Sequence, residues 1–245
     1  MFGSGVDKRV IYILLAVLVF YSLISMSAEA WLSIIITLPA VIVAITFHEY
    51  AHAKMADKFG DTTPRNQGRL TLNPLAHMDP FGFVLLMFAH IGWGKPVQIN
   101  PNNFTSNKSR SFCESMVALA GPLMNFTIAI VSAVIYLLIL KLNPILFSTR
   151  MGLMLDIFLE MLITINIGLG VFNLVPLPPL DGEKIFKNIL PYNAKAWLDR
   201  NEQTLYMVFM ILWIFGVLEV IVSPVINLIT KGMFWVINFI IGIFI

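Results

Sequence analysis

Cysteine and charge are the scarcest features of this 245-residue chain. Its single cysteine, Cys113, excludes an internal disulfide and an all-cysteine metal site, so a bound metal would need histidine and carboxylate ligands. Charged residues make up 12% of the sequence, against about a quarter in soluble domains, and hydrophobic residues make up 58%. This composition indicates a membrane protein. The net charge of +2 lies in loops rather than in one basic patch, so nucleic acid is not an expected partner.

Long apolar runs predict the fold class, an all-α polytopic membrane protein. Crossing the hydrocarbon core takes about 20 apolar residues. No repeat of fixed period is visible, and the one large loop, residues 57–111, is itself partly apolar, so we expect a single transmembrane domain over residues 1–245. The sequence predicts about six transmembrane helices, at Val10–Ser27, Trp31–Ala56, Phe112–Leu140, Ile157–Leu174, Leu205–Val222 and Val225–Ile245.

The distribution of lysine and arginine predicts the orientation. With alternating spans that start inside, basic residues gather in the inner segments, and only Lys141 and Arg150 fall in the outer ones. The positive-inside rule therefore places the amino terminus in the cytoplasm, and we expect a multi-pass protein of a prokaryotic plasma membrane. A cleaved signal peptide is the alternative for the first run, because Ala28-Glu29-Ala30 resembles a cleavage site, although the run is longer than usual.

The second predicted span carries His48, Glu49 and His52 near its carboxyl end. Two histidines four residues apart lie about 40° apart around a helix, one above the other, so both imidazoles can bind one metal ion. The glutamate between them is then placed to reach a water molecule on that metal. The alternative is a helix end that emerges into water, where histidine and glutamate are ordinary residues. Ionisable groups beside a membrane span are usually functional, which favours the metal site.

The fourth span ends in Asn173-Leu174-Val175-Pro176-Leu177-Pro178-Pro179-Leu180-Asp181-Gly182. Its prolines cannot continue a helix, and irregular chain at membrane depth must pack in protein or line a cavity. Asp181 either forms a turn that caps a short helix to Leu190 or serves as a metal ligand. The second and fourth spans run in the same direction, so their ends lie at one depth. Because a catalytic zinc normally has three protein ligands, Asp181 is the expected partner of the two histidines.

Three further motifs stand in the same part of the chain, Gly68-Arg69-Leu70-Thr71-Leu72-Asn73-Pro74, Gly92-Trp93-Gly94-Lys95-Pro96-Val97 and Gly121-Pro122-Leu123-Met124-Asn125. Together with His48–His52 and the segment around Asp181, they resemble the site-2 protease family of intramembrane metalloproteases. The resemblance covers about residues 40–190 and fits the minimal branch without extra soluble domains. It implies a catalytic core at about 31–190, flanked by helices at 10–27 and 205–245.

The resemblance also implies roles for individual residues. One zinc per chain is expected on His48, His52 and Asp181, with Glu49 as general base and acid. The implied reaction is hydrolysis of peptide bonds in or near transmembrane segments, with single-pass or membrane-anchored proteins as substrates and the lipid bilayer as surroundings.

Two substrate-binding regions are implied as well. Asn125 is expected near the metal, where it would hold the substrate or the developing oxyanion. Family members carry a membrane-associated β-hairpin, which would be Trp93–Asn100 here. Its edge near Val97 and Ile99 could capture an unwound substrate as an added strand.

Two other functions remain open from the residues alone, a membrane zinc-binding regulator without catalysis and a metal-ion transporter. An intact Glu49 argues against the regulator, because a pure binding site needs no base. The absence of a sequence repeat argues against the transporter. His77 and Asp79 are interpreted as loop residues and His90 as a packed histidine.

Overall fold

The computed structural model describes residues 25–79, 82 and 94–244. Within these residues four helices are long and apolar enough to cross a membrane, with spans at Ile34–Lys58, Arg110–Leu142, Arg150–Asn173 and Val217–Phe244. The α-helices are α2 (Ala28–Lys58), α3 (Thr63–Asn66), α5 (Arg110–Leu142), α6 (Arg150–Asn173), α7 (Asp181–Ile189), α8 (Tyr192–Ile214) and α9 (Val217–Phe244). Short 3-10 turns lie at Pro74–Ala76, Pro101–Asn103 and Pro144–Ser148.

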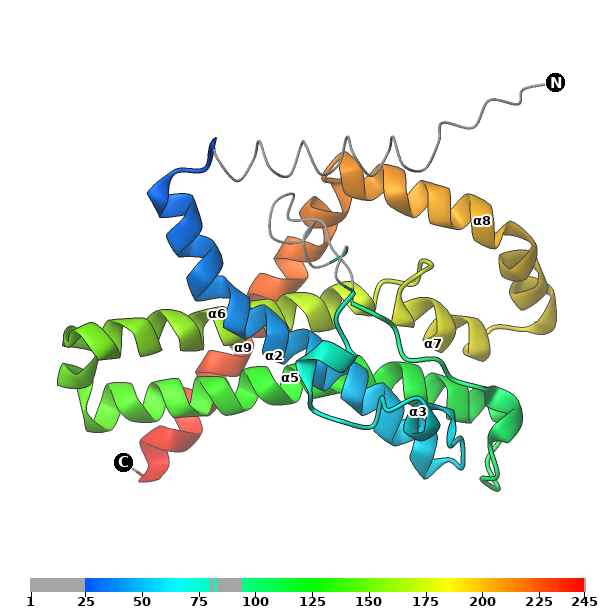
Figure 1. Ribbon diagram of the computed structural model, residues 1–245, viewed down its shortest axis with the longest axis horizontal. Helices are drawn as coiled ribbons and strands as arrows, with labels where there is room; N and C mark the ends of the chain where they lie inside the picture. The colour runs from blue at the N-terminus through cyan, green and yellow to red at the C-terminus, as the bar shows by residue number, and fades with distance from the viewer. Residues whose placement is uncertain (1–24, 80–81, 83–93, 245) are drawn as a thin grey trace.

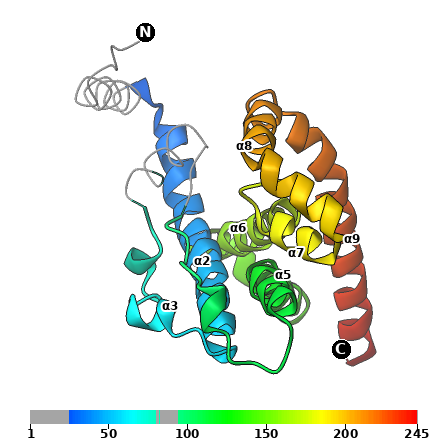
Figure 2. The same cartoon turned by 90° about the vertical axis from the view of Figure 1, so that its right-hand side faces the viewer.

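The antiparallel pair α5 and α6 is the centre of the structure (Figure 1). Ser109 caps α5 by accepting a hydrogen bond from the Phe112 amide, and Thr149 caps α6 by accepting one from the Gly152 amide. Helix α2 crosses this pair, and α9 packs on its other side (Figure 2). Helices α2 and α6 run toward the same side of the molecule, the side on which α7 follows α6 (Figure 1).

The apolar core lies between the second half of α5, the middle of α6, and α9. Small side chains such as Ala129 and Ala133 are fully buried and let the helices approach closely, as is usual in membranes. The buried members of this core are Ala129, Ala133, Leu137, Ile163, Ile167, Val171, Val222, Ile237 and Ile241.

The predicted spans agree with the structure at α2, α5 and α6 but not at the carboxyl end. The boundary was expected at Ser223 and Pro224, whereas the helices separate at Gly216, whose φ of 69° is the left-handed conformation that ends a helix. Pro224 lies inside α9, where membrane surroundings tolerate the lost hydrogen bond. The predicted first span, residues 10–27, lies almost wholly outside the described residues.

The expected β-hairpin is not confirmed. Trp93 lies outside the described residues, and residues 94–100 form an extended segment joined to the chain before it by one isolated bridge between Gly94 and Met78. Proline has no amide hydrogen, so Pro96 cannot donate to a ladder. The amides of Val97 and Asn100 donate instead to the carboxylates of Glu49 and Asp61.

Candidate metal centre

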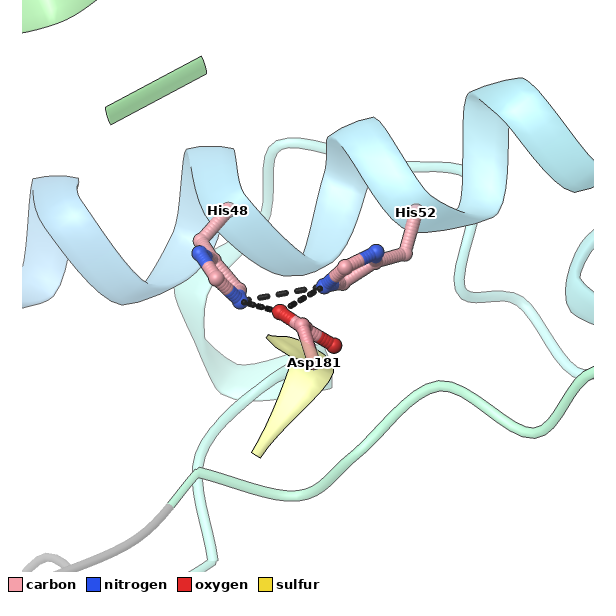
Figure 3. A group of neighbouring side chains, drawn as sticks. All are labelled: His48, His52 and Asp181. Atoms are coloured by element: carbon pink, nitrogen blue, oxygen red, sulfur yellow. Dashed lines mark hydrogen bonds and ion pairs between the residues drawn. The ribbon is translucent and has the colours of Figure 1, made fainter. Parts of the chain in front are cut away.

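Helix α2 brings the two predicted histidines together near its carboxyl end. His48 and His52 are each 6% exposed, and their Nε2 atoms lie 3.0 Å apart. The ring centroids are 4.6 Å apart with planes nearly perpendicular, and both Nε2 atoms face the same position (Figure 3). The helical spacing alone therefore brings together two of the three candidate ligands.

Asp181 completes the group from the start of α7 (Figure 3). Its Oδ2 atom lies 3.1 Å from the Nε2 atom of His48 and 3.1 Å from that of His52. The neighbouring Gly182 makes this placement possible, because a Cβ there would lie 2.4 Å from the carbonyl oxygens of Leu174 and Val175. The cap position of α7 is Leu180, so the Asp181 side chain is not used as a helix cap.

Both imidazoles are held from behind by hydrogen-bond acceptors. The Nδ1 atom of His48 lies 2.6 Å from Oδ1 of Asn125, and that of His52 lies 2.7 Å from the carbonyl oxygen of Val117. Both acceptors belong to α5, which comes so close at Gly121 that a Cβ there would lie 2.4 Å from Nε2 of His52. Each Nδ1 atom therefore carries the hydrogen, and in a neutral imidazole the Nε2 atom then presents a lone pair.

Three electron-pair donors thus converge on one point. Burial would raise the pKa of Asp181, but the positive charge and hydrogen bonds that His52 and His48 supply when protonated outweigh burial and hold this pKa below its usual value. A carboxylate and two lone pairs at 3.0–3.1 Å need a positive charge between them. Ligands around tetrahedral zinc lie about 3.3 Å apart, so the donor set fits that ion.

Glu49 lies beside this group on the wall of a cavity of about 550 Å³. Its Oε2 atom accepts a hydrogen bond of 2.9 Å from the Val97 amide. The cavity is lined by both histidines and Asp181 as well as by the predicted Val97 and Ile99, and it continues to charged residues of α7 and α8. A peptide and a water molecule in this cavity would therefore meet both the three candidate metal ligands and a further carboxylate.

Asn125 is close to the centre but is fully buried, and its amide group already has three partners. Besides accepting from His48, it donates to the carbonyl oxygen of Ala44 and to Oδ1 of Asn166. The sequence interpretation missed Asn166 and Val117. Asn166 is a polar residue within a predicted span, which was an available signal, whereas a backbone carbonyl such as that of Val117 has no signature in sequence. His77 is buried in its loop, where it bonds to the Thr71 carbonyl oxygen.

Comparison with known proteins identifies the family. Residues 36–216 match the model of "Peptidase family M50". The chain belongs to peptidase family M50. It is 37% identical over 188 residues to "Putative zinc metalloprotease YwhC" of Bacillus subtilis, which covers 76% of this chain and 84% of that protein. No solved structure matches.

Two relatives of lower identity have similar names. "Putative zinc metalloprotease MJ0611" of Methanocaldococcus jannaschii is 29% identical over 84% of this chain and 96% of its own length. "Putative zinc metalloprotease Rip2" of Mycobacterium tuberculosis is 27% identical over 72% of this chain and 68% of its own length. The resemblance to site-2 proteases is confirmed, so the protein is an intramembrane zinc metalloprotease, and its family implies membrane-embedded protein substrates.

Proposed function

We propose that His48, His52 and Asp181 hold the catalytic zinc and that Glu49 is the general base and acid of peptide hydrolysis. The observation that carries this proposal is the convergence of three donor atoms, all within 4.8 Å of one another, on a cavity that Glu49 also lines. The ligands come from two helices far apart in sequence, as expected for a site formed by the fold.

The chemistry follows from the positions of these groups. When bound, zinc would supply Lewis-acid activation, lowering the pKa of water from about 15.7 toward about 7 and polarising a carbonyl group. Glu49 takes the proton from the attacking water and delivers it to the leaving amine as the peptide bond breaks. Its hydrogen bond from the Val97 amide orients the carboxylate and leaves lone pairs on both oxygens.

The substrate would lie along the extended segment that contains Val97 and Ile99. Both residues line the cavity beside Glu49, so a substrate strand alongside them would bring a peptide bond to the carboxylate. Transmembrane helices hide their peptide bonds, and pairing with an extended segment satisfies the backbone groups that unwinding exposes. We expect single-pass or membrane-anchored proteins to be the substrates. The family resemblance predicts Asn125 as a contact of the substrate or oxyanion, but its amide is occupied by His48, Ala44 and Asn166, so we do not include it in the substrate site.

The topology proposed with this function is a single domain with about six spans and a cytoplasmic amino terminus. Basic residues lie in the last turns of α2 at Lys54 and Lys58 and after it at Arg65, and others lie on α7, the helix that begins with Asp181. By the positive-inside rule the side of the metal centre is cytoplasmic. The relatives in Bacillus, Mycobacterium and Methanocaldococcus are consistent with a prokaryotic plasma membrane.

Glu49→Gln tests the proposal, because glutamine keeps the size and one acceptor oxygen but cannot take a proton. Cleavage of a membrane-anchored reporter should fall at least about 100-fold, the usual lower range for loss of a general base, with zinc content unchanged. Glu160→Gln changes an exposed glutamate of α6 that does not line the cavity, so it is the matched control and should keep activity within about twofold. Full activity of Glu49→Gln would contradict the assignment.

A further inference from the structure

Two fully buried asparagines lie behind His48, and they come from different helices. Asn125 belongs to α5 and Asn166 to α6, and both are 0% exposed. Nδ2 of Asn125 donates to Oδ1 of Asn166 at 2.9 Å, and Nδ2 of Asn166 donates to the Leu162 carbonyl oxygen at 2.8 Å. A continuous hydrogen-bonded chain therefore runs from the backbone of α6 to the imidazole of His48.

Backbone carbonyls fix the direction of each amide in this chain. A carbonyl oxygen can only accept, so the Asn166 atom that faces Leu162 must be nitrogen, and its Oδ1 atom then faces Asn125. The Ala44 carbonyl, 3.1 Å from Asn125, fixes that amide in the same way. Oδ1 of Asn125 consequently faces His48 and can only accept.

This arrangement decides where His48 keeps its single hydrogen. Oδ1 of Asn125, 2.6 Å from Nδ1, competes for it with two acceptors beside Nε2, namely Oδ2 of Asp181 at 3.1 Å and Nε2 of His52 at 3.0 Å. A hydrogen on Nε2 would block the lone pair with which His48 binds a metal ion. The shorter contact, made by an amide that cannot turn over, keeps the hydrogen on Nδ1 and leaves Nε2 free.

We propose that Asn125 and Asn166 are positioning residues that hold His48 in the metal-binding tautomer, rather than residues that bind the substrate. This inference rests on the proposed role of His48 as a zinc ligand. Both amide hydrogens of Asn125 are already donated, to Ala44 and to Asn166, so neither is left for an oxyanion. His52 needs no such pair, because the Val117 carbonyl holds its Nδ1 atom directly.

The test compares Asn125→Leu, Asn166→Leu and the control Ser132→Ala, which removes a buried polar group of α5 from the apolar core side. Zinc affinity is measured by competition with a chromophoric chelator. The His48 tautomer is measured by nitrogen-15 NMR of histidine-labelled, metal-free protein. Outer contacts of metal ligands contribute about 10–100-fold to affinity, so we expect losses of about 100-fold for Asn125→Leu and about tenfold for Asn166→Leu. Both variants should move the hydrogen of His48 toward Nε2, and the control should change neither quantity.

The proposal would be overturned if both leucine variants kept zinc affinities within twofold of wild type and an unchanged His48 tautomer. A fall in kcat alone would assign Asn125 to the substrate instead. A leucine variant that does not fold is replaced by its alanine counterpart, which also lacks the acceptor oxygen and should move the hydrogen of His48 toward Nε2; an unchanged tautomer would overturn the proposal. His48→Ala distinguishes a failure of the proposed metal site from a failure of this inference. If it binds zinc like wild type, the proposed metal site fails, and if it loses zinc while the asparagine variants do not, only this inference fails.

Discussion

The two halves of the α5 and α6 pair are packed in different ways. Toward the metal centre, α5 presents the Val117 carbonyl, Gly121 and Asn125, and the polar groups there are buried in contact with one another. Toward the other end, α5 presents Ala129 and Ala133 to apolar residues of α6 and α9. The polar half depends on hydrogen-bond geometry, whereas the apolar half depends on close contact of small side chains.

This difference implies that function and stability can be separated within one helix pair. A substitution in the polar half should change zinc binding more than folding, because it displaces atoms that must meet within a few tenths of an ångström. A substitution in the apolar half should change the free energy of unfolding and leave the metal ligands in place.

The largest effect is expected from Gly121→Ala. Its Cβ would lie 2.4 Å from Nε2 of His52 and 2.6 Å from Cε1 of His48, so the imidazoles or α5 must shift. Because such a shift separates the donor atoms, zinc affinity should fall at least about 100-fold, as for loss of an outer contact or more. The measurement is chelator competition on purified protein, with helical content checked by circular dichroism.

Gly232→Ala is the matched control for that substitution, because nothing lies within 4 Å of a Cβ at this position of α9. It should leave zinc affinity unchanged and stabilise the helix slightly, by up to about 1 kcal/mol. Equal zinc affinity in Gly121→Ala and Gly232→Ala would show that α5 does not confine the histidines.

Smaller functional effects are expected in the apolar half. Ile163→Ala removes a buried side chain of α6 that is 2% exposed, and it should lower the free energy of unfolding by about 2–4 kcal/mol. Ile163→Val should lower it by only about 1 kcal/mol. Denaturation in mixed micelles measures both, and zinc affinity of the folded protein should match wild type. If zinc affinity fell in proportion to the free energy of unfolding in these variants, the two halves would not be separable in function and stability.

The parts of the site that follow from local periodicity could be predicted from the sequence. His48, Glu49 and His52 are one helical turn, and a helix places such residues without any information about its partners. Asp181 required one more step, the equal depth of two span ends, and the structure places its carboxylate against both histidines.

Features that depend on contacts between distant segments could not be predicted in the same way. Asn166 acts on His48 only through Asn125 of another helix, and the Val117 carbonyl is chemically the same as every other carbonyl in the chain. The boundary between α8 and α9 was misplaced because Pro224 is a stronger general helix breaker than Gly216, yet the left-handed conformation occurs at the glycine. The hairpin was expected from resemblance, and side-chain acceptors take its amides instead.

Zinc binding by Asp181→Asn tests the central claim most directly. The substitution keeps the size of the side chain and removes the negative charge at the meeting point of the two imidazoles. Wild-type protein should bind one zinc per chain, and the variant should bind it at least about 100-fold more weakly, since a ligand contributes no less than an outer contact. If Asp181→Asn binds one zinc as tightly as wild type, helices α2 and α7 do not share a metal ion and the assignment is wrong.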